Sequence, residues 1–313
     1  MPVQEQQKYR LVTRSDMDGL ICAVLLRELD LIDDILFVHP KDMQDGKVAV
    51  TDRDIVTNLP YVEQAHLVFD HHLSETVRNE KGLPNHVIDA EAPSAARVVY
   101  RHYGGSERFS PFFDDMMAAV DKADSAQFTM EDVLEPKGWE LLSFLMDART
   151  GLGRFREFRI SNYNLMMDLI ERCKHLSIEE VLELPDVVER RELYSAQAEK
   201  FKQQLLDRAT VHGNVVVLDL RDQDPIWAGN RFMIYALFPQ CNISIHVIDG
   251  FRKQNTSLAI GKSIFNRTSR TNIGEIALQN GGGGHMNAGT CQVANEEADA
   301  ILKTIVARLN EEG

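Results

Sequence analysis

Short apolar runs bounded by polar residues alternate with helical patterns through the first seventy residues of the chain. The runs at 9–13, 35–38, 47–51 and 65–69 predict strands, and the strongly apolar stretch at 20–29 predicts a buried helix. Strands that alternate with helices at this spacing are typical of a parallel sheet. We therefore expect an α/β fold in which the N-terminal domain is a parallel sheet with helices on both faces.

A change in the pattern near residue 190 predicts a second, smaller α/β domain. Helical patterns occupy 93–103, 111–124, 139–147 and 161–174, and the charged stretch at 186–208 predicts an exposed helix. Beyond it, strands are predicted at 214–220, 242–248 and 256–261, and helices at 272–280 and 295–310. We expect domains at 1–190 and 213–313, a helical linker at 191–212, and a cleft between the domains.

Acidic or imidazole side chains directly follow three of the predicted strands. In an open α/β sheet, ligands bind outside the carboxyl ends of the strands. Three strands that each deliver such side chains to one edge of a sheet therefore predict a functional site. The residues concerned are Asp16, Asp18, Asp52, Asp70, His71 and His72.

The residue types at this edge are those that bind divalent cations. Asp16 and Asp18 can address two neighbouring cations, Asp52 can bridge them, and His71 or His72 adds a nitrogen ligand. Mixed Asp and His ligation favours Mn²⁺, with Mg²⁺ or Co²⁺ as alternatives, because calcium prefers oxygen ligands and structural zinc brings cysteines. One or two ions are expected, and two ions about 3.5–4 Å apart form the usual hydrolytic clamp on phosphate.

A further acid is available near the end of the helix predicted at 111–124. Asp121 and Asp124 are both candidates for the metal site, and both are also compatible with an exposed helix end. Surface acids are common, so the sequence leaves the choice between them open.

The net charge of −14 limits the partners of this chain. Binding to long DNA or RNA depends on neutralising many phosphates, so we expect no long duplex, while a small phosphorylated ligand stays compatible. No apolar stretch has the length of a membrane span, and residues 1–7 lack the pattern of a secretory signal. The four scattered cysteines show no metal-finger or redox spacing. We therefore expect a cytoplasmic protein that does not bind membranes.

A basic segment in the C-terminal domain predicts a phosphate-binding surface. Residues 250–274 contain no acid and five basic side chains, and four glycines at 281–284 precede His285. Backbone amides in a glycine-rich loop can approach a phosphate closely because no Cβ intervenes. A solvated basic face and a flexible turn are the simpler readings of each feature taken alone.

These motifs together resemble the DHH phosphoesterase superfamily. Residues 13–19 resemble its first motif, Asp52 the second, 70–72 the tripeptide that names it, and 124–128 the fourth. Residues 281–289 resemble the glycine-rich signature of the DHH-associated C-terminal domain. The likeness spans roughly residues 8 to 295 in the superfamily's motif order, which makes the ordered set far more specific than the tripeptide alone.

The resemblance implies a role for each matching position. Asp16 and Asp52 would hold a first ion, and Asp18, Asp52, His71 and Asp124 a second. His72 would face the substrate phosphate, where it hydrogen-bonds the phosphate or protonates the leaving oxygen, and Asp70 would orient His71. The implied substrate-binding residues are Lys262, Arg267, Gly282, Gly283, Gly284 and His285.

Arg14 departs from the superfamily's pattern, because a His or Asp that binds the first ion is common at that position. Arginine cannot coordinate a cation. Three readings compete: the first ion binds weakly and arrives with substrate, Arg14 clamps phosphate in place of an ion, or the chain binds nucleotide without catalysis.

The expected function is metal-dependent hydrolysis of a small phosphorylated nucleotide: a short oligonucleotide, a dinucleotide or a nucleoside bisphosphate. Short single-stranded nucleic acid is an allowed partner, and the resemblance suggests a homodimer. The alternatives are an exopolyphosphatase-like hydrolase and a nucleotide-binding or sensing protein whose metal site is impaired by Arg14.

Overall fold

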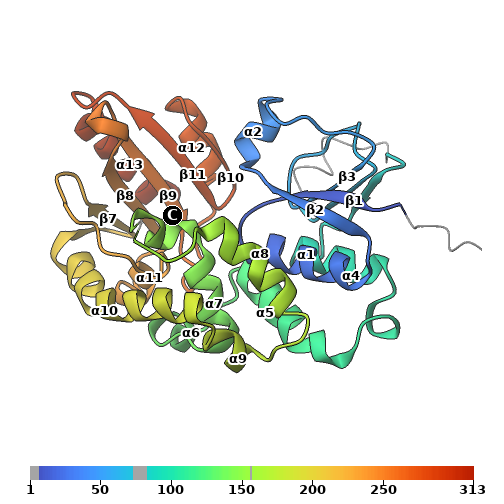
Figure 1. The fold of residues 1–313 in the computed structure, drawn as a ribbon. Coiled ribbons are helices and arrows are strands. Elements are labelled where there is room, and N and C mark those ends of the chain that lie inside the picture. Colours follow the sequence, from blue (N-terminus) through green and yellow to red (C-terminus); the bar gives the residue numbers. More distant parts are fainter. Residues whose placement is uncertain (1–6, 73–82, 156) are drawn as a thin grey trace, which may run out of the picture. The chain divides into compact units, whose positions relative to one another are not determined.

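Two separate sheets organise the chain (Figure 1). The computed structural model describes residues 7–72, 83–155 and 157–313. The first unit comprises Met1–Gln127, Lys137–Ala148 and Leu152–Glu192, and the second comprises Phe128–Pro136, Arg149–Gly151 and Leu193–Gly313. The second unit thus takes two short segments, 128–136 and 149–151, that the sequence placed within the N-terminal domain. Each unit is described by itself.

The first unit contains a five-stranded sheet in the order β2-β1-β3-β4-β5, and every neighbouring pair is parallel. Val12 pairs with Val56, and Val56 with Val68, so three valines line one face of the sheet. Met43 of α2 packs into the same buried cluster. The strands are β1 (Tyr9–Thr13), β2 (Ile32–Phe37), β3 (Asp54–Thr57), β4 (Leu67–Asp70) and β5 (His86–Ile88).

Helix α1 (Met17–Glu28) lies at the centre of the first unit. Every residue from Met17 to Leu26 is buried, because the helix packs against α4, α5 and α8 as well as against β2. The apolar character of this stretch therefore predicts its burial correctly. The other helices of this unit are α2 (Pro40–Gln44), α4 (Ala95–His102), α5 (Asp114–Asp124), α7 (Gly138–Met146), α8 (Asn162–Arg172) and α9 (Ile178–Leu182).

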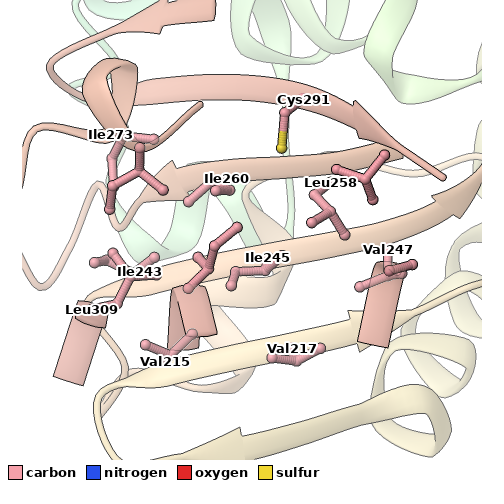
Figure 2. Packing of buried hydrophobic residues seen from close by; sticks show 14 residues of the cluster. Val215, Val217, Ile243, Ile245, Val247, Leu258, Ile260, Ile273, Cys291 and Leu309 are labelled. Atoms are coloured by element: carbon pink, nitrogen blue, oxygen red, sulfur yellow. The ribbon is translucent and has the colours of Figure 1, made fainter. Parts of the chain in front are cut away.

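The second unit contains a six-stranded mixed sheet in the order β10-β11-β9-β8-β7-β6. Among the described residues of this sheet, β7 and β8 form the only parallel pair, and the other neighbouring strands are antiparallel. Figure 2 shows the buried face of this sheet, where Val215, Ile245 and Ile260 meet Ile273 of α12 and Leu309 of α13. The strands are β6 (Ala209–His212), β7 (Val215–Asp219), β8 (Ile243–Asp249), β9 (Thr256–Lys262), β10 (Gly283–His285) and β11 (Ala288–Val293).

Further helices complete the second unit, and one long helix runs from the first unit into it. Helix α10 (Pro185–Arg208) covers the charged stretch that predicts an exposed helix, and it begins within the first unit. The remaining helices are α6 (Met130–Leu134), α11 (Met233–Leu237), α12 (Ile273–Gln279) and α13 (Ala298–Glu312). Turns of 3₁₀ helix lie at Gly105–Glu107, Pro111–Phe113, Ala148–Thr150, Leu152–Arg154 and Phe251–Lys253.

The predicted α/β class and the parallel N-terminal sheet are confirmed, but one strand is misplaced. The strand predicted at 47–51 does not form; β3 instead begins at Asp54 and ends at Thr57. The apolar alternation of 47–51 places Val48 and Val50 against the edge of a core cluster without bringing them into the sheet. Within residues 7–72, 83–155 and 157–313, no helix has both the length and the apolar character needed to cross a membrane.

Candidate active site

Asp18 is anchored at the carboxyl edge of the first sheet by the N-terminus of another helix. Its carboxylate accepts hydrogen bonds from the backbone N–H of Ala95 (3.0 Å) and of Ala96 (2.8 Å), the first two residues of α4. Gly19 is required beside it, because a Cβ at that position would lie 1.9 Å from the Arg14 carbonyl oxygen. The side chain of Asp18 is therefore 1% exposed and held in one place.

Three side chains from distant parts of the chain converge at this point. His71 follows β4, and Asp124 is the last residue of α5. One ligand atom from each of Asp18, His71 and Asp124 lies within 4.8 Å of the other two. His71 Nε2 lies 2.9 Å from Asp124 Oδ2, and His71 Nδ1 lies 3.2 Å from the Ala92 carbonyl oxygen. The carbonyl oxygen can only accept, so it fixes the proton on Nδ1 and leaves Nε2 facing the carboxylates.

The electrostatics of the three residues favour a positive charge at their centre. Burial raises the pKa of Asp18 well above its ordinary value, and the nearby Asp124 carboxylate adds to the rise. Burial lowers the pKa of His71, but its contact with Asp124 and the charges of Asp124 and Asp18 outweigh that effect and raise the pKa to about 9. Two oxygen donors and one imidazole nitrogen are a ligand set that divalent cations such as Mn²⁺ accept. The residues present therefore fit a divalent ion.

The structure assigns Asp70 to a different imidazole from the one that the sequence predicted. Asp70 Oδ1 lies 2.7 Å from Nδ1 of His72, and it accepts hydrogen bonds from the backbone N–H of His71 (2.8 Å) and of His72 (3.3 Å). The expectation that Asp70 orients the His71 ring is wrong here, because the Ala92 carbonyl makes that contact. Asp70 is 1% exposed and positions His72, whose side chain is 46% exposed.

The structure also separates the two acids of α5. Asp121 accepts hydrogen bonds from Ser94 Oγ (2.7 Å) and from Arg97 Nε (2.8 Å), so its charge is already balanced by an arginine. Asp124 faces His71 instead. The structure therefore places Asp124, and not Asp121, in the group of ligand atoms.

Asp52 is not at this edge of the sheet, which corrects the prediction that it bridges two ions. It lies in the exposed turn before β3. The strands of this sheet are parallel, so the start of β3 lies at the opposite edge from the residues that follow β1 and β4. The polar residue that follows β3 is Asn58. It was not predicted as part of the site because asparagine is also a common turn former.

Arg14 and Asp16 form an ion pair beside the three ligand residues. Arg14 Nε lies 3.1 Å from Asp16 Oδ2, and Asp16 Oδ1 accepts a hydrogen bond (3.0 Å) from Gly19 N–H at the start of α1. Asp16 is not a member of the group formed by Asp18, His71 and Asp124. In this structure the acid is paired with arginine, so only three of the predicted ligands come together.

The residues predicted to bind substrate lie in the second unit, where strand pairing brings two of them to one place. Lys262 N–H donates to the Asn287 carbonyl (2.9 Å), and His285 pairs with Ala288 in the turn between β10 and β11. The Lys262 ammonium donates to the Ser269 carbonyl (3.3 Å), and partial burial lowers the pKa of that lysine. Arg267 Nε donates to the Ile264 carbonyl (2.8 Å) in the adjacent turn.

The glycines before His285 differ in what surrounds their backbone. Cβ atoms at Gly282 and Gly284 would lie 2.1 and 2.3 Å from carbonyl oxygens of β11, so these residues allow β10 to pack closely. A Cβ at Gly283 would meet nothing within 4 Å. The predicted loop is therefore partly a strand, and Gly281 and Gly283 leave open space beside the backbone.

The parallel sheet with carboxylates and an imidazole at its carboxyl edge, and the second unit with its glycine-rich turn and histidine, agree with the motif order expected of a metal-dependent phosphoesterase. The chain belongs to the DHH phosphoesterase superfamily. The predicted enzyme class, a metal-dependent phosphoesterase, is confirmed with it.

The chain is 61% identical to PggH, a pGpG-specific phosphodiesterase from Vibrio cholerae; the match covers 98% of this chain and 100% of that one, with a TM-score of 0.86. It also matches RecJ from Thermus thermophilus, solved with Mg²⁺, at 16% identity and a TM-score of 0.50, over 98% of this chain and 50% of RecJ. The RecJ likeness shows the fold alone. No family model and no curated protein matches the chain.

Proposed function

We propose that this protein hydrolyses pGpG, a linear dinucleotide with a 5′ phosphate, with Mn²⁺ as its metal. The observation that carries the proposal is the convergence of Asp18, His71 and Asp124 at the carboxyl edge of the parallel sheet, in a chain that is 61% identical to a pGpG-specific phosphodiesterase. A divalent ion held by these residues would supply Lewis-acid stabilisation of the charge that builds up on the phosphoryl group.

Water attacks phosphorus as the bond to the leaving oxygen breaks, which yields two molecules of GMP, and the protein's own side chains assist this step. His72 donates a proton to the leaving oxygen, and buried Asp70, 2.7 Å from its Nδ1, holds the ring in position. Lys262, Arg267 and His285 bind the remote phosphate or nucleotide end of the substrate, and Gly283 lets backbone approach it. Binding at two ends of the dinucleotide supplies the positioning that this reaction requires.

The test is GMP release from pGpG, followed by chromatography, with Mn²⁺ and with a chelator. We expect Asp124→Asn to lower kcat at least about a hundredfold, because charge stabilisation by the ion is worth several kcal/mol. Asp52→Ala is the matched control: it also removes one aspartate, but at the exposed opposite edge of the sheet, and it should leave kcat unchanged.

A substrate panel separates the proposal from its alternatives. It would contain pGpG, pApA, a short oligoribonucleotide and a short-chain polyphosphate. Turnover of polyphosphate in preference to pGpG would support an exopolyphosphatase-like enzyme. Tight binding of pGpG without turnover at any metal tested would refute hydrolysis and support a binding protein.

A further inference from the structure

The residues that follow the three central strands differ in charge, and this difference bears on how many cations the protein holds. Asp16 comes after β1, Asn58 after β3, and His71 after β4. Asp18, His71 and Asp124 form one group of ligand atoms. Asp16 stands outside that group, in an ion pair with Arg14 at 3.1 Å.

Asn58 is a buried amide for which the described residues offer no hydrogen-bond partner at either polar side-chain atom. It is 2% exposed and has a φ of 54°, a conformation that asparagine tolerates better than most residues. Burying an amide without hydrogen-bond partners is unfavourable, so its presence at this edge points to a polar ligand. The backbone N–H of Asn58 donates to the Phe69 carbonyl (3.1 Å). This hydrogen bond places Asn58 between Arg14 and Asp70 along the sheet edge.

Charge balance indicates that one cation is held without substrate. Asp18 and Asp124 carry two negative charges, which match one divalent ion. A second ion needs further anionic ligands, and the neutral amide of Asn58 adds none. The remaining acids at this edge are Asp16 and Asp70. A guanidinium already balances the charge of Asp16, and Asp70 is held by the backbone of His71 and the ring of His72.

We propose that Arg14 makes the binding of a second cation depend on phosphate, so that the free protein holds one ion and the phosphate-bound protein holds two. This inference rests on the proposed function for the identity of the ligand. Guanidinium pairs well with the oxygens of phosphate. A phosphate that takes over the Arg14 guanidinium releases Asp16 from its ion pair, and the Asn58 amide then supplies an oxygen to the cation or a donor to the phosphate.

The experiment counts Mn²⁺ bound per chain by equilibrium dialysis and elemental analysis, without and with GMP, against a GMP blank that lacks protein. We expect the wild-type count to rise from one to two when GMP is added. Arg14→His should bind two ions without GMP, because it removes the cation that competes for Asp16 and adds an imidazole. Arg14→Lys keeps the positive charge and should hold one.

Two ions on the GMP-free wild type, one ion in the presence of GMP, or one ion on Arg14→His would each overturn the proposal. The count does not depend on turnover. A rise from one to two in a protein that does not hydrolyse pGpG would therefore refute the proposed activity alone, and hydrolysis with an unchanged count would refute the role of Arg14 alone.

Discussion

Replacing Asp70 tests whether His72 is a general acid. All three contacts of Asp70 with the two histidines use Oδ1. Asp70→Asn can keep an oxygen at that position and removes only the negative charge. Asp70→Ala removes the acceptor altogether, so the pair of variants separates the charge of Asp70 from its support of the turn.

The expected magnitude follows from the change in one hydrogen bond. A bond to a charged group is worth about 1.5–3 kcal/mol and a neutral bond about 0.5–1.5 kcal/mol. The difference of about 1–1.5 kcal/mol corresponds to roughly a tenfold loss of kcat on pGpG for Asp70→Asn. Asp70→Ala leaves two backbone N–H groups and a ring nitrogen without their acceptor, so it should also lower the free energy of unfolding by about 2–4 kcal/mol.

The assay compares pGpG with a p-nitrophenyl ester of a nucleoside 5′-phosphate. A nitrophenolate leaves without protonation, so a loss that arises from general-acid catalysis should appear with pGpG and nearly disappear with the nitrophenyl ester. Equal losses with both substrates would refute proton donation by His72 and support a contact with the phosphate instead.

Three further predictions concern His71, His246 and the buried Arg190. The pKa of His71 near 9 means that Mn²⁺ displaces a proton below that pH, so affinity measured by calorimetry should rise about tenfold per pH unit from 6.5 to 8.5; a flat profile would contradict this. Burial lowers the pKa of His246 from 6.5 to about 4, so wild-type stability should fall by at most about 3 kcal/mol as the pH drops through that window, and urea unfolding of His246→Gln should lack this loss. Arg190 is 1% exposed and donates to the Ile160 carbonyl (2.8 Å) and to Asn162 Oδ1 (3.0 Å). Arg190→Met should therefore lower the melting temperature by leaving these two acceptors without their donor, without changing kcat at lower temperature; an unchanged melting temperature would count against it.

Part of the site could be predicted from sequence because strand ends are local features. Asp18 and His71 each follow a short apolar run, and a parallel sheet brings such positions to one edge. The prediction for Asp52 was wrong for the same local reason. The run before Asp52 is more apolar than the true strand, which begins with the charged residue Asp54. The sequence offers one signal for Asn58, an apolar pair followed by Thr57 and an asparagine, but many turns share it.

The choice between Asp121 and Asp124 could not be made locally, since both lie in the last turn of the same helix. Arg97 and Ser94 decide it by holding Asp121. These partners lie 24 and 27 residues away, and no spacing rule indicates them.

The contact that most defines the site is also the least local. Asp18 reaches the N–H groups of α4 across 77 and 78 residues of chain. The N-terminus of a helix favours a negative charge, so α4 supports Asp18 in its ionised form against burial and against the nearby Asp124 carboxylate. One side chain thereby joins two helices and holds a ligand oxygen in position before a cation binds. Because the N-terminus of α4 donates hydrogen bonds to Asp18, substitution of Asp18 should affect both the packing of α4 and the affinity for metal. Substitution of Asp124 should affect chiefly the affinity for metal.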